Sequence, residues 1–473
     1  MIMSGIKTHI GMMAAGLGFL ASFAFFQFAY PYHLIRREQM DLFVWDWVYI
    51  RQTYRGAGWL ARMVSDFLEQ FFHLPVAGPL IVALLLTGIG VVVYRICRHF
   101  LKEWPSLGIA TLFVVWSFLR ECGNLYITRY TVVTLAYLSL VLLALQCRKA
   151  WQKPVAAVLL LALGFWTLES PFHEHYGKVY GVPRLNYEKV IALDVETSRE
   201  HWDKVLRLSK KDLYMEEASY CYNIAHAKMG DLGQTLLNHS QNHYYTLLFP
   251  VSGDKTVFSN TLAGEAWFQL GDMTVAEQSA ITSLQASPRH TGVRYLVRLA
   301  QVNLISGEDA AAQKYLNLLG KTLFYGKWAR SMMPGRQDET TRAQFEAARA
   351  NLLRKDIVHL SDRPREILHS LLEVNPDNQV AREYLLCFDL MCYDLEQFMV
   401  DYARYPRPGR LYHEAILIWL SQHERMTPNN VTSYGIDLST VDRMNRFGRN
   451  PGGYKNTYWY YYLNGMYEAS EEQ

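Results

Sequence analysis

Three acidic side chains, Glu38, Asp41 and Asp46, follow closely after the first long apolar stretch of the chain, and Arg36 and Arg37 precede them. A carboxylate can take a proton from an attacking hydroxyl group, and a guanidinium can hold a phosphate leaving group. These three acids are therefore the candidates for catalysis. Charged residues beside a membrane more commonly solvate the helix that carries them, so we expect the acids to be exposed interfacial charges.

The position of these acids resembles that in membrane-embedded glycosyltransferases that use lipid-linked sugars. Those enzymes place a carboxylate in the first outer loop, directly after the first membrane span, and the same loop carries two helices that lie along the membrane. Some of them also carry a C-terminal helical solenoid. The resemblance implies an acid–base role for one of the three acids. That class has more spans than the chain shows, so the resemblance supports only an alternative function.

A second candidate centre is the pair His173 and His175, which could chelate a metal ion only from an extended segment. A third ligand would have to come from a distant histidine: His201, His239 or His243. This is not the ligand spacing of a zinc site, so we predict no metal, and His173 and His175 remain weak candidates. The sequence contains no phosphate-binding or nucleophile motif of the familiar kinds, so we predict no cofactor.

Charged residues are sparse at the start of the chain, where they make up 22 of the first 169 residues against 69 of the other 304. Apolar stretches account for this difference, since a spanning helix needs about 20 apolar residues. The net charge of +3, without a dense basic patch, argues against a nucleic-acid partner. The sequence predicts an all-α protein that begins with a transmembrane domain, 1–169, of about five spans: 9–30, 76–94, 105–119, 131–146 and 154–168.

Basic loops give the orientation of these spans. The loops at 95–102 and 148–153 join the second to the third span and the fourth to the fifth, so we expect them on the cytoplasmic side. The odd number of spans then places everything after Glu169 in the periplasm. In the outer turn between the third and fourth spans, we expect Glu121 to form a local ion pair with a neighbouring arginine, Arg120 or Arg129, at the membrane surface. A contact of these charges with a lipid headgroup is the alternative.

The first outer loop, 31–75, contains two stretches with helical spacing of apolar residues, 42–52 and 60–71. Both predict amphipathic helices that lie on the membrane surface. Within the first span, small residues recur four apart, a spacing that permits close helix packing. These pairs are Gly11 with Ala15 and Ala14 with Gly18.

After a linker at 170–184, the chain consists of successive short helical stretches separated by glycine or proline. One stretch has the spacing of a tetratricopeptide repeat, in which small residues let two helices touch and a Gly-Asp pair forms the turn. Its residues are Gly264, Trp267, Gly271, Asp272, Ala276, Ala280, Ser283 and Pro288. The region 185–420 resembles a degenerate tetratricopeptide-like α-solenoid, and such surfaces usually bind peptides or other proteins.

The last segment, 421–473, is rich in aromatic residues, six of which fall within 454–462. Aromatic side chains bury large areas at low entropic cost. We therefore expect this segment to dock on the solenoid rather than to bind a sugar.

Two motifs, DFLEQFF at 66–72 and TYWYY at 457–461, combine with the spans and the repeats. The combination resembles a family of uncharacterised membrane proteins of the Bacteroidota, and this implies a Gram-negative inner membrane without assigning an activity. We predict a non-enzymatic protein that sits in the lipid bilayer and presents its periplasmic repeats to a protein partner, in cell-envelope assembly. The alternatives are a glycosyltransferase-like enzyme using a carboxylate of the first outer loop, and a subunit of a larger transport or secretion complex.

Overall fold

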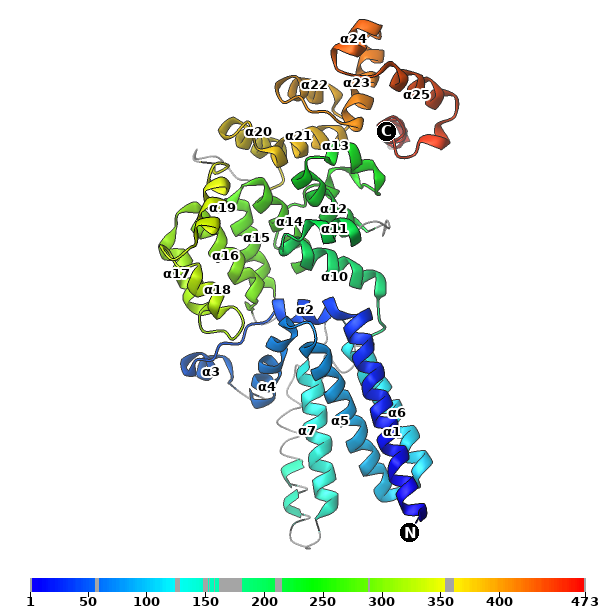
Figure 1. Ribbon diagram of the computed structural model, residues 1–473, viewed down its shortest axis with the longest axis vertical. Helices are drawn as coiled ribbons and strands as arrows, with labels where there is room; N and C mark the ends of the chain where they lie inside the picture. Colours follow the sequence, from blue (N-terminus) through cyan, green and yellow to red (C-terminus); the bar gives the residue numbers. More distant parts are fainter. Residues whose placement is uncertain are drawn as a thin grey trace. The chain divides into compact units, whose positions relative to one another are not determined.

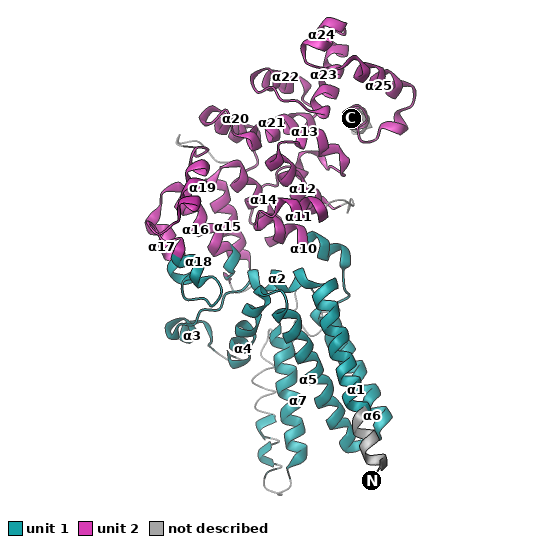
Figure 2. Ribbon diagram, viewed as in Figure 1, with its two compact units in different colours: residues 1–191, 291–294, 316–330 teal, residues 192–290, 295–315, 331–473 magenta. Residues whose placement is uncertain are grey.

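The structure is a computed structural model that describes residues 2–55, 59–123, 128–147, 152, 154–156, 158–160, 181–208, 215–287, 290–353 and 361–471. These residues form helices and contain no β-strand, as the sequence predicted. The chain divides into two compact units (Figure 2). Unit 1 comprises residues 1–191, 291–294 and 316–330, and unit 2 comprises residues 192–290, 295–315 and 331–473.

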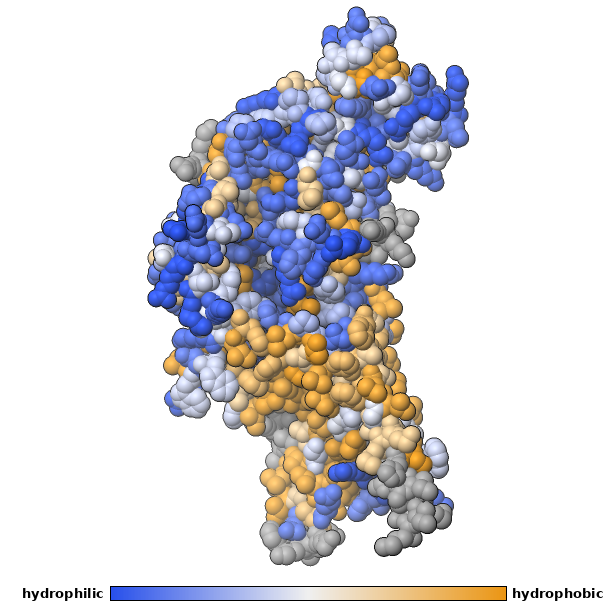
Figure 3. Space-filling model, viewed as in Figure 1, coloured by the Kyte–Doolittle hydropathy of each residue, from blue (hydrophilic) through white to orange (hydrophobic). Residues whose placement is uncertain are grey.

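Long helices that run side by side form the body of unit 1 (Figure 1). They are α1 (Ile2–Ala24), which continues into the π-helical turn η1 (Phe25–Ala29), α5 (Ala77–Phe100), α6 (Glu103–Glu121) and α7 (Thr128–Gln146). Helix α5 is central, because it packs against α1, α6 and α7. Apolar side chains dominate the surface of these helices (Figure 3), which is the pattern of a membrane-embedded bundle.

Three segments of the described residues are long and apolar enough to cross a membrane: Ile10–Ala29, Ala77–Phe100 and Thr128–Gln146. They correspond to the first, second and fourth predicted spans, and their presence is consistent with a membrane protein. Helix α6 coincides with the third predicted span but is not among the three segments. Most of the fifth predicted span lies outside the described residues. A bundle of five spans therefore stays a prediction.

The loop 31–75 folds into short helices: α2 (Pro31–Gln39), α3 (Trp47–Thr53), α4 (Trp59–Glu69) and the 3₁₀ turn η2 (Gln70–His73). Helices α3 and α4 fall in the two stretches with helical spacing, whereas the sequence pattern did not predict α2. Proline at the first position of α2 suits a helix start, because its fixed φ is already helical. Trp45 and Trp47 are 72% and 69% exposed at the start of α3.

Unit 2 is an array of short helices. They are α11 (Trp202–Leu208), α12 (Glu216–Met229), α13 (Leu232–Thr235), η3 (Leu236–Asn238), η4 (His243–Thr246), α14 (Val257–Leu270), α15 (Met273–Ala286), α19 (Glu339–Arg349), α20 (Pro364–Val374), α21 (Gln379–Met391), α22 (Leu395–Arg404), α23 (Arg410–Gln422), α24 (Pro428–Ser433), α25 (Leu438–Arg449), η6 (Pro451–Tyr454) and α26 (Tyr458–Glu471). Four further helices are divided between the units: α10 (Leu185–Ser198), α16 (Val293–Ser306), α17 (Asp309–Leu319) and α18 (Gly326–Ser331). Consecutive helices pack on each other, as in α14 with α15, α20 with α21 and α21 with α22.

The helix pair α14 and α15 shows how the sequence forms such a unit. Helix α14 ends at Gly271, whose φ of +101° suits glycine, and Asp272 caps α15 by accepting the N–H of Val275 at 3.0 Å. A Cβ on Gly264 would lie 2.3 Å from Ser279 Oγ, so the two helices approach closely there. Ala276 and Ala280 of α15 are 0% and 4% exposed. This is the close packing that the small residues predicted.

The C-terminal aromatic residues pack on their own unit. Tyr458 and Trp459 are 0% and 2% exposed. The Tyr458 hydroxyl donates to the carbonyl of Leu390 at 2.9 Å, and Trp459 Nε1 donates to the carbonyl of Glu414 at 3.0 Å. Helix α26 is thereby joined to α21 and α23.

Replacing Ala280 with phenylalanine should lower the stability of unit 2 by about 1–3 kcal/mol, because the larger side chain overpacks the contact between α14 and α15. The neighbouring Ile281→Phe is the matched control, since Ile281 is 38% exposed on the same helix. Thermal unfolding of the detergent-solubilised protein measures both changes. Equal melting temperatures for the wild type and Ala280→Phe would contradict the assigned packing.

Candidate functional site

A buried ion pair joins α2 to the helix bundle of unit 1. Arg37 Nη1 lies 2.7 Å from Glu121 Oε2, and the two side chains are 8% and 0% exposed. Arg37 Nη2 also donates to the backbone oxygen of Glu121 at 2.5 Å, and the hydroxyl of Thr131 donates to the second carboxylate oxygen. Helix α2 is therefore fixed to α6 and α7. This corrects the prediction that Glu121 pairs locally with Arg120 or Arg129, because α2 folds back and brings Arg37 to Glu121.

A carboxylate from α10 fixes the start of α2. Glu188 Oε1 accepts the backbone N–H of Tyr32 at 2.6 Å, and Glu188 Oε2 accepts that of His33 at 3.1 Å. The first N–H groups of a helix have no partner within the helix, so this contact satisfies them. Burial raises the pKa of Glu188 to about 8, although the two hydrogen bonds oppose the shift.

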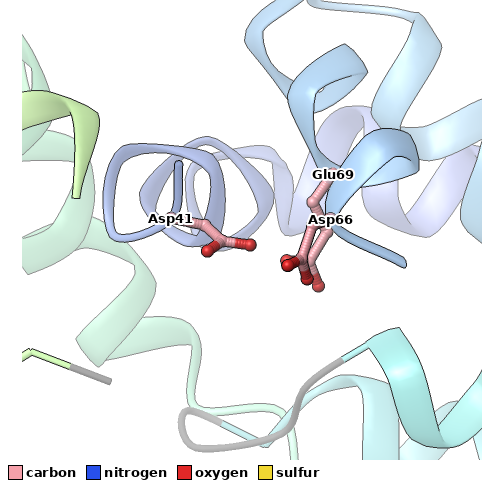
Figure 4. A group of neighbouring side chains, drawn as sticks. All are labelled: Asp41, Asp66 and Glu69. Atoms are coloured by element: carbon pink, nitrogen blue, oxygen red, sulfur yellow. The ribbon is translucent and has the colours of Figure 1, made fainter. Parts of the chain in front are cut away.

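Beyond the end of α2, three carboxylates from two segments converge (Figure 4). Asp41 follows α2, and Asp66 and Glu69 belong to α4. One carboxylate oxygen of each residue lies within 4.8 Å of the others, and the residues are 9%, 2% and 4% exposed. Figure 4 shows the carboxylates of Asp66 and Glu69 side by side, with that of Asp41 directed toward them. We call these three residues the acidic cluster.

The acidic cluster lines a small cavity of about 20 Å³. Glu38 lines the same cavity, together with Thr322, Phe324 and Tyr325. The Tyr325 hydroxyl donates to Glu38 Oε2 at 3.2 Å, so this segment covers the acids. A space of this size holds one water molecule or one ion. A sugar ring does not fit in it.

The acids of the cluster also make contacts that hold the fold together. The Tyr54 hydroxyl donates to Asp66 Oδ2 at 2.9 Å, and the carbonyl of Asp41 accepts the N–H of Val293 at 3.0 Å. Glu69 Oε1 accepts the N–H of Thr128, the first residue of α7, at 3.1 Å. The cluster is therefore part of the contact between α4 and α7 as well as a chemical centre.

Three carboxylates this close repel one another when all are ionised. Burial, followed by the charges of Asp41 and Asp66, raises the pKa of Glu69 to about 8, while a hydrogen bond with Thr128 and the guanidinium of Arg37 oppose the shift. Glu69 therefore retains a proton near neutral pH. The cluster can exchange a proton with a bound group, and its carboxylate oxygens are of the kind that divalent cations prefer. Among the described residues, the acidic cluster is the group of potential metal ligands whose oxygen atoms lie close enough together to hold a metal ion.

The structure separates the three acids that the sequence proposed for catalysis. Asp41 lies in the acidic cluster and Glu38 beside it, and both are buried, which corrects the expectation of exposed interfacial charges. Asp46 is not among the residues of the cluster or its cavity. It caps α3, accepting the N–H groups of Val48 and Tyr49, and its Oδ2 lies 2.8 Å from Lys321 Nζ. The weak metal candidates, His173 and His175, lie outside the described residues.

Sequence reasoning missed Asp66 and Glu69 as site residues. Their spacing of three places them on one face of α4, which is a signal available from the sequence. The amphipathic pattern of α4 concealed it, because acids on such a helix are expected to face water. Tertiary packing makes these positions buried: Tyr54 donates to Asp66, the N–H of Thr128 donates to Glu69, and Phe324 and Tyr325 line the same cavity.

One family model matches residues 6–173 and 168–465, and together these segments cover almost the whole chain. It is described as a family of unknown function, DUF6057. No curated protein and no solved structure matches the chain.

Replacing Glu69 with glutamine should flatten the dependence of stability on pH. The pKa of this carboxyl is raised in the folded state from 4.5 to about 8, so the folded protein keeps a proton that the unfolded chain releases. Its contribution to stability is full below pH 4.5 and is lost as the pH rises toward about 8. We expect the melting temperature of the wild type to fall more steeply over this window than that of Glu69→Gln.

Asp46→Asn is the control for this experiment, because the hydrogen bond from Lys321 lowers the pKa of Asp46 and its titration lies below the window. It should retain the slope of the wild type. The same slope in Glu69→Gln would show that Glu69 does not carry the raised pKa.

Proposed function

The chain belongs to DUF6057, a family of unknown function, and we propose from its own geometry that it is a membrane enzyme whose reactive centre is the acidic cluster. The reaction class that fits best is group transfer from a lipid-linked sugar, the alternative that the loop layout suggested. The enzyme would reside in the inner membrane of a Gram-negative bacterium. The resemblance to the Bacteroidota family supports that location.

One observation supports this proposal above the others: Asp41 is buried and lies within 4.8 Å of Asp66 and Glu69. Burying three carboxylates together costs stability, since each ionised group loses its hydration. Surface acids that only solvate a helix avoid this cost. Strongly shifted pKa values produced by burial and like charges are typical of reactive sites.

The chemistry follows from the proximity of the three carboxyl groups and from the raised pKa of Glu69. Asp41 or Asp66, when ionised, could accept a proton from an acceptor hydroxyl, while protonated Glu69 could donate one. Because the cavity holds only one water molecule or ion, the sugar would bind outside it and present a hydroxyl to the cluster. A divalent cation bound by the same oxygens would neutralise the developing charge of the leaving group.

A second candidate is the partner-recruiting protein that the sequence favoured. The consecutive packing of helices such as α14 with α15 and α20 with α21 supports it, because stacked helix pairs form the extended surfaces that tetratricopeptide-like proteins use. The two functions are compatible, since the acidic cluster belongs to unit 1 and this helix array to unit 2. In either case unit 2 would lie in the periplasm and act in cell-envelope assembly.

The C-terminus is predicted to lie in the periplasm. A reporter active only in that compartment, fused after Gln473, should be active, because an odd number of spans and the basic loops at 95–102 and 148–153 require it. A second fusion within 149–153 should be inactive. If both fusions are active, the orientation is wrong upstream of the fifth predicted span.

Replacing Asp41 with asparagine should lower the activity by about 10²–10⁴-fold, because it removes a proton-accepting charge and little volume. A strain that lacks the gene is complemented with each variant, and incorporation of labelled sugar into the envelope is measured. Glu38→Gln, which changes a residue beside the cluster, is tested in parallel. The melting temperature of each purified variant shows whether it is folded.

Asp46→Asn is the matched control, since asparagine caps a helix as well as aspartate does and Asp46 lies apart from the cluster. It should complement fully. Full complementation by a folded Asp41→Asn variant would reject the enzyme and favour the partner-recruiting function, in which a stable protein partner should co-purify after mild detergent extraction.

A further inference from the structure

An apolar groove runs between α1, α5 and α6. It has a volume of about 400 Å³. Small residues of α1 form one wall, among them Gly11, Ala15 and Gly18, and Gly90 and Val114 belong to the walls on α5 and α6. The groove exists because α1 and α6 both pack chiefly on α5 and make few contacts with each other.

The groove belongs to helices that are long and apolar enough to cross a membrane, so we expect it within the hydrocarbon layer. Its lining residues on α1 fall within Ile10–Ala29, and those on α5 fall within Ala77–Phe100, which are two of the three segments able to cross a membrane. The lining residues carry no charge. The Thr87 hydroxyl is satisfied, since it donates to the carbonyl of Ala83 at 2.7 Å. The walls therefore offer dispersion contacts to an apolar chain and no charge to a headgroup.

The small residues of α1 act differently along the helix. A Cβ on Gly11 would lie 3.1 Å from the ring of Tyr94, so this end of α1 is closely packed on α5, as the spacing of small residues predicted. A Cβ on Gly18 would meet nothing within 4 Å, although Gly18 lines the groove. At Gly18 the small residue keeps space open instead of permitting a helix contact.

The lining decides which occupant fits. It consists of uncharged residues, with small side chains along α1, and it leaves a volume of about 400 Å³. A narrow, flexible hydrocarbon chain can follow such walls and gains dispersion contacts from both sides. In a membrane, lipid chains are the molecules present at this depth, and an unfilled groove would forfeit contacts on both walls.

We propose that this groove binds one hydrocarbon chain of a membrane lipid. The inference does not rest on the proposed function, because its residues belong to other helices than the acidic cluster. A bound chain would fill the space between α1 and α6 and would contact both helices as well as α5.

The test is photolabelling of the full-length protein in phosphatidylcholine nanodiscs that contain a small fraction of phosphatidylcholine with a diazirine in mid-chain. After irradiation, labelled peptides of α1, α5 and α6 are mapped by mass spectrometry. Gly18→Leu should fill the groove without a clash, and it should reduce labelling of Ala15, Val114 and the other groove residues several-fold.

Gly16→Leu is the matched control. A Cβ on Gly16 also meets nothing within 4 Å, but Gly16 is not a lining residue of the groove. This variant should leave labelling of the groove unchanged. Labelling of Leu17 and Leu20, which are 66% and 60% exposed, reports ordinary lipid around the protein and should stay the same in Gly18→Leu.

Two further measurements keep the proposal testable if Gly18→Leu does not fold. Native mass spectrometry of the wild type, after exchange into detergent, should retain one phosphatidylcholine molecule. Val114→Phe should lower both that retention and the labelling. The proposal would be overturned by equal groove labelling in folded Gly18→Leu and Gly16→Leu, or by the absence of retained lipid. It would also be overturned if a cysteine placed at Gly18 formed a disulfide between two copies, because the groove would then belong to a contact with a second copy of the chain.

Discussion

The position of α2 on the helix bundle of unit 1 depends on the buried ion pair between Arg37 and Glu121. Two charges with 8% and 0% exposure lose their hydration, and the pair is tolerable because each partner has further hydrogen bonds. Removing one partner of such a pair typically costs about 3–5 kcal/mol, since the other charge is left buried and alone. The pair holds α2 against α6 and α7, and the position of Asp41, two residues after the end of α2, follows from it.

The acidic cluster shows the same balance between charge and burial. Asp66 receives the Tyr54 hydroxyl and Glu69 receives the N–H of Thr128, so both acids contribute to the fold. Each of these contacts explains one acid by itself. They do not explain why three carboxylates lie within 4.8 Å of one another. A retained proton on Glu69 lowers the repulsion, and a bound cation would remove it.

The cluster and the intramembrane groove are built on different parts of unit 1. The cluster lies on the loop 31–75, and Thr322, Phe324 and Tyr325 line the same cavity. The groove lies on α1, α5 and α6, where the lining residues are uncharged. They share no residue, so the two proposals can fail separately. Helix α1 connects them, because the chain passes from the groove wall through η1 into α2.

The sequence by itself determined the features that depend on residues a few positions apart. Continuous apolar stretches give α1, α5 and α7, and the spacing of Gly264, Ala276 and Ala280 gives the close packing of α14 on α15. Local order fixes these features, because helical periodicity decides which side chains share a face. Asp66 and Glu69 belong to this group too, since their spacing places them together on α4.

Only the tertiary structure decided which charges are buried and with what partners. Glu121 pairs with Arg37 across 84 residues of sequence, and the cap of α2 comes from Glu188, 156 residues from Tyr32. The burial of Glu38 and Asp41 likewise depends on a distant segment. Tyr325, which donates to Glu38 and lines the same cavity as Asp41, lies 287 residues further along the chain than Glu38. Periodicity carries no information about such contacts. The energy of a buried carboxylate depends on the groups that surround it in space, and distant parts of the chain supply those groups.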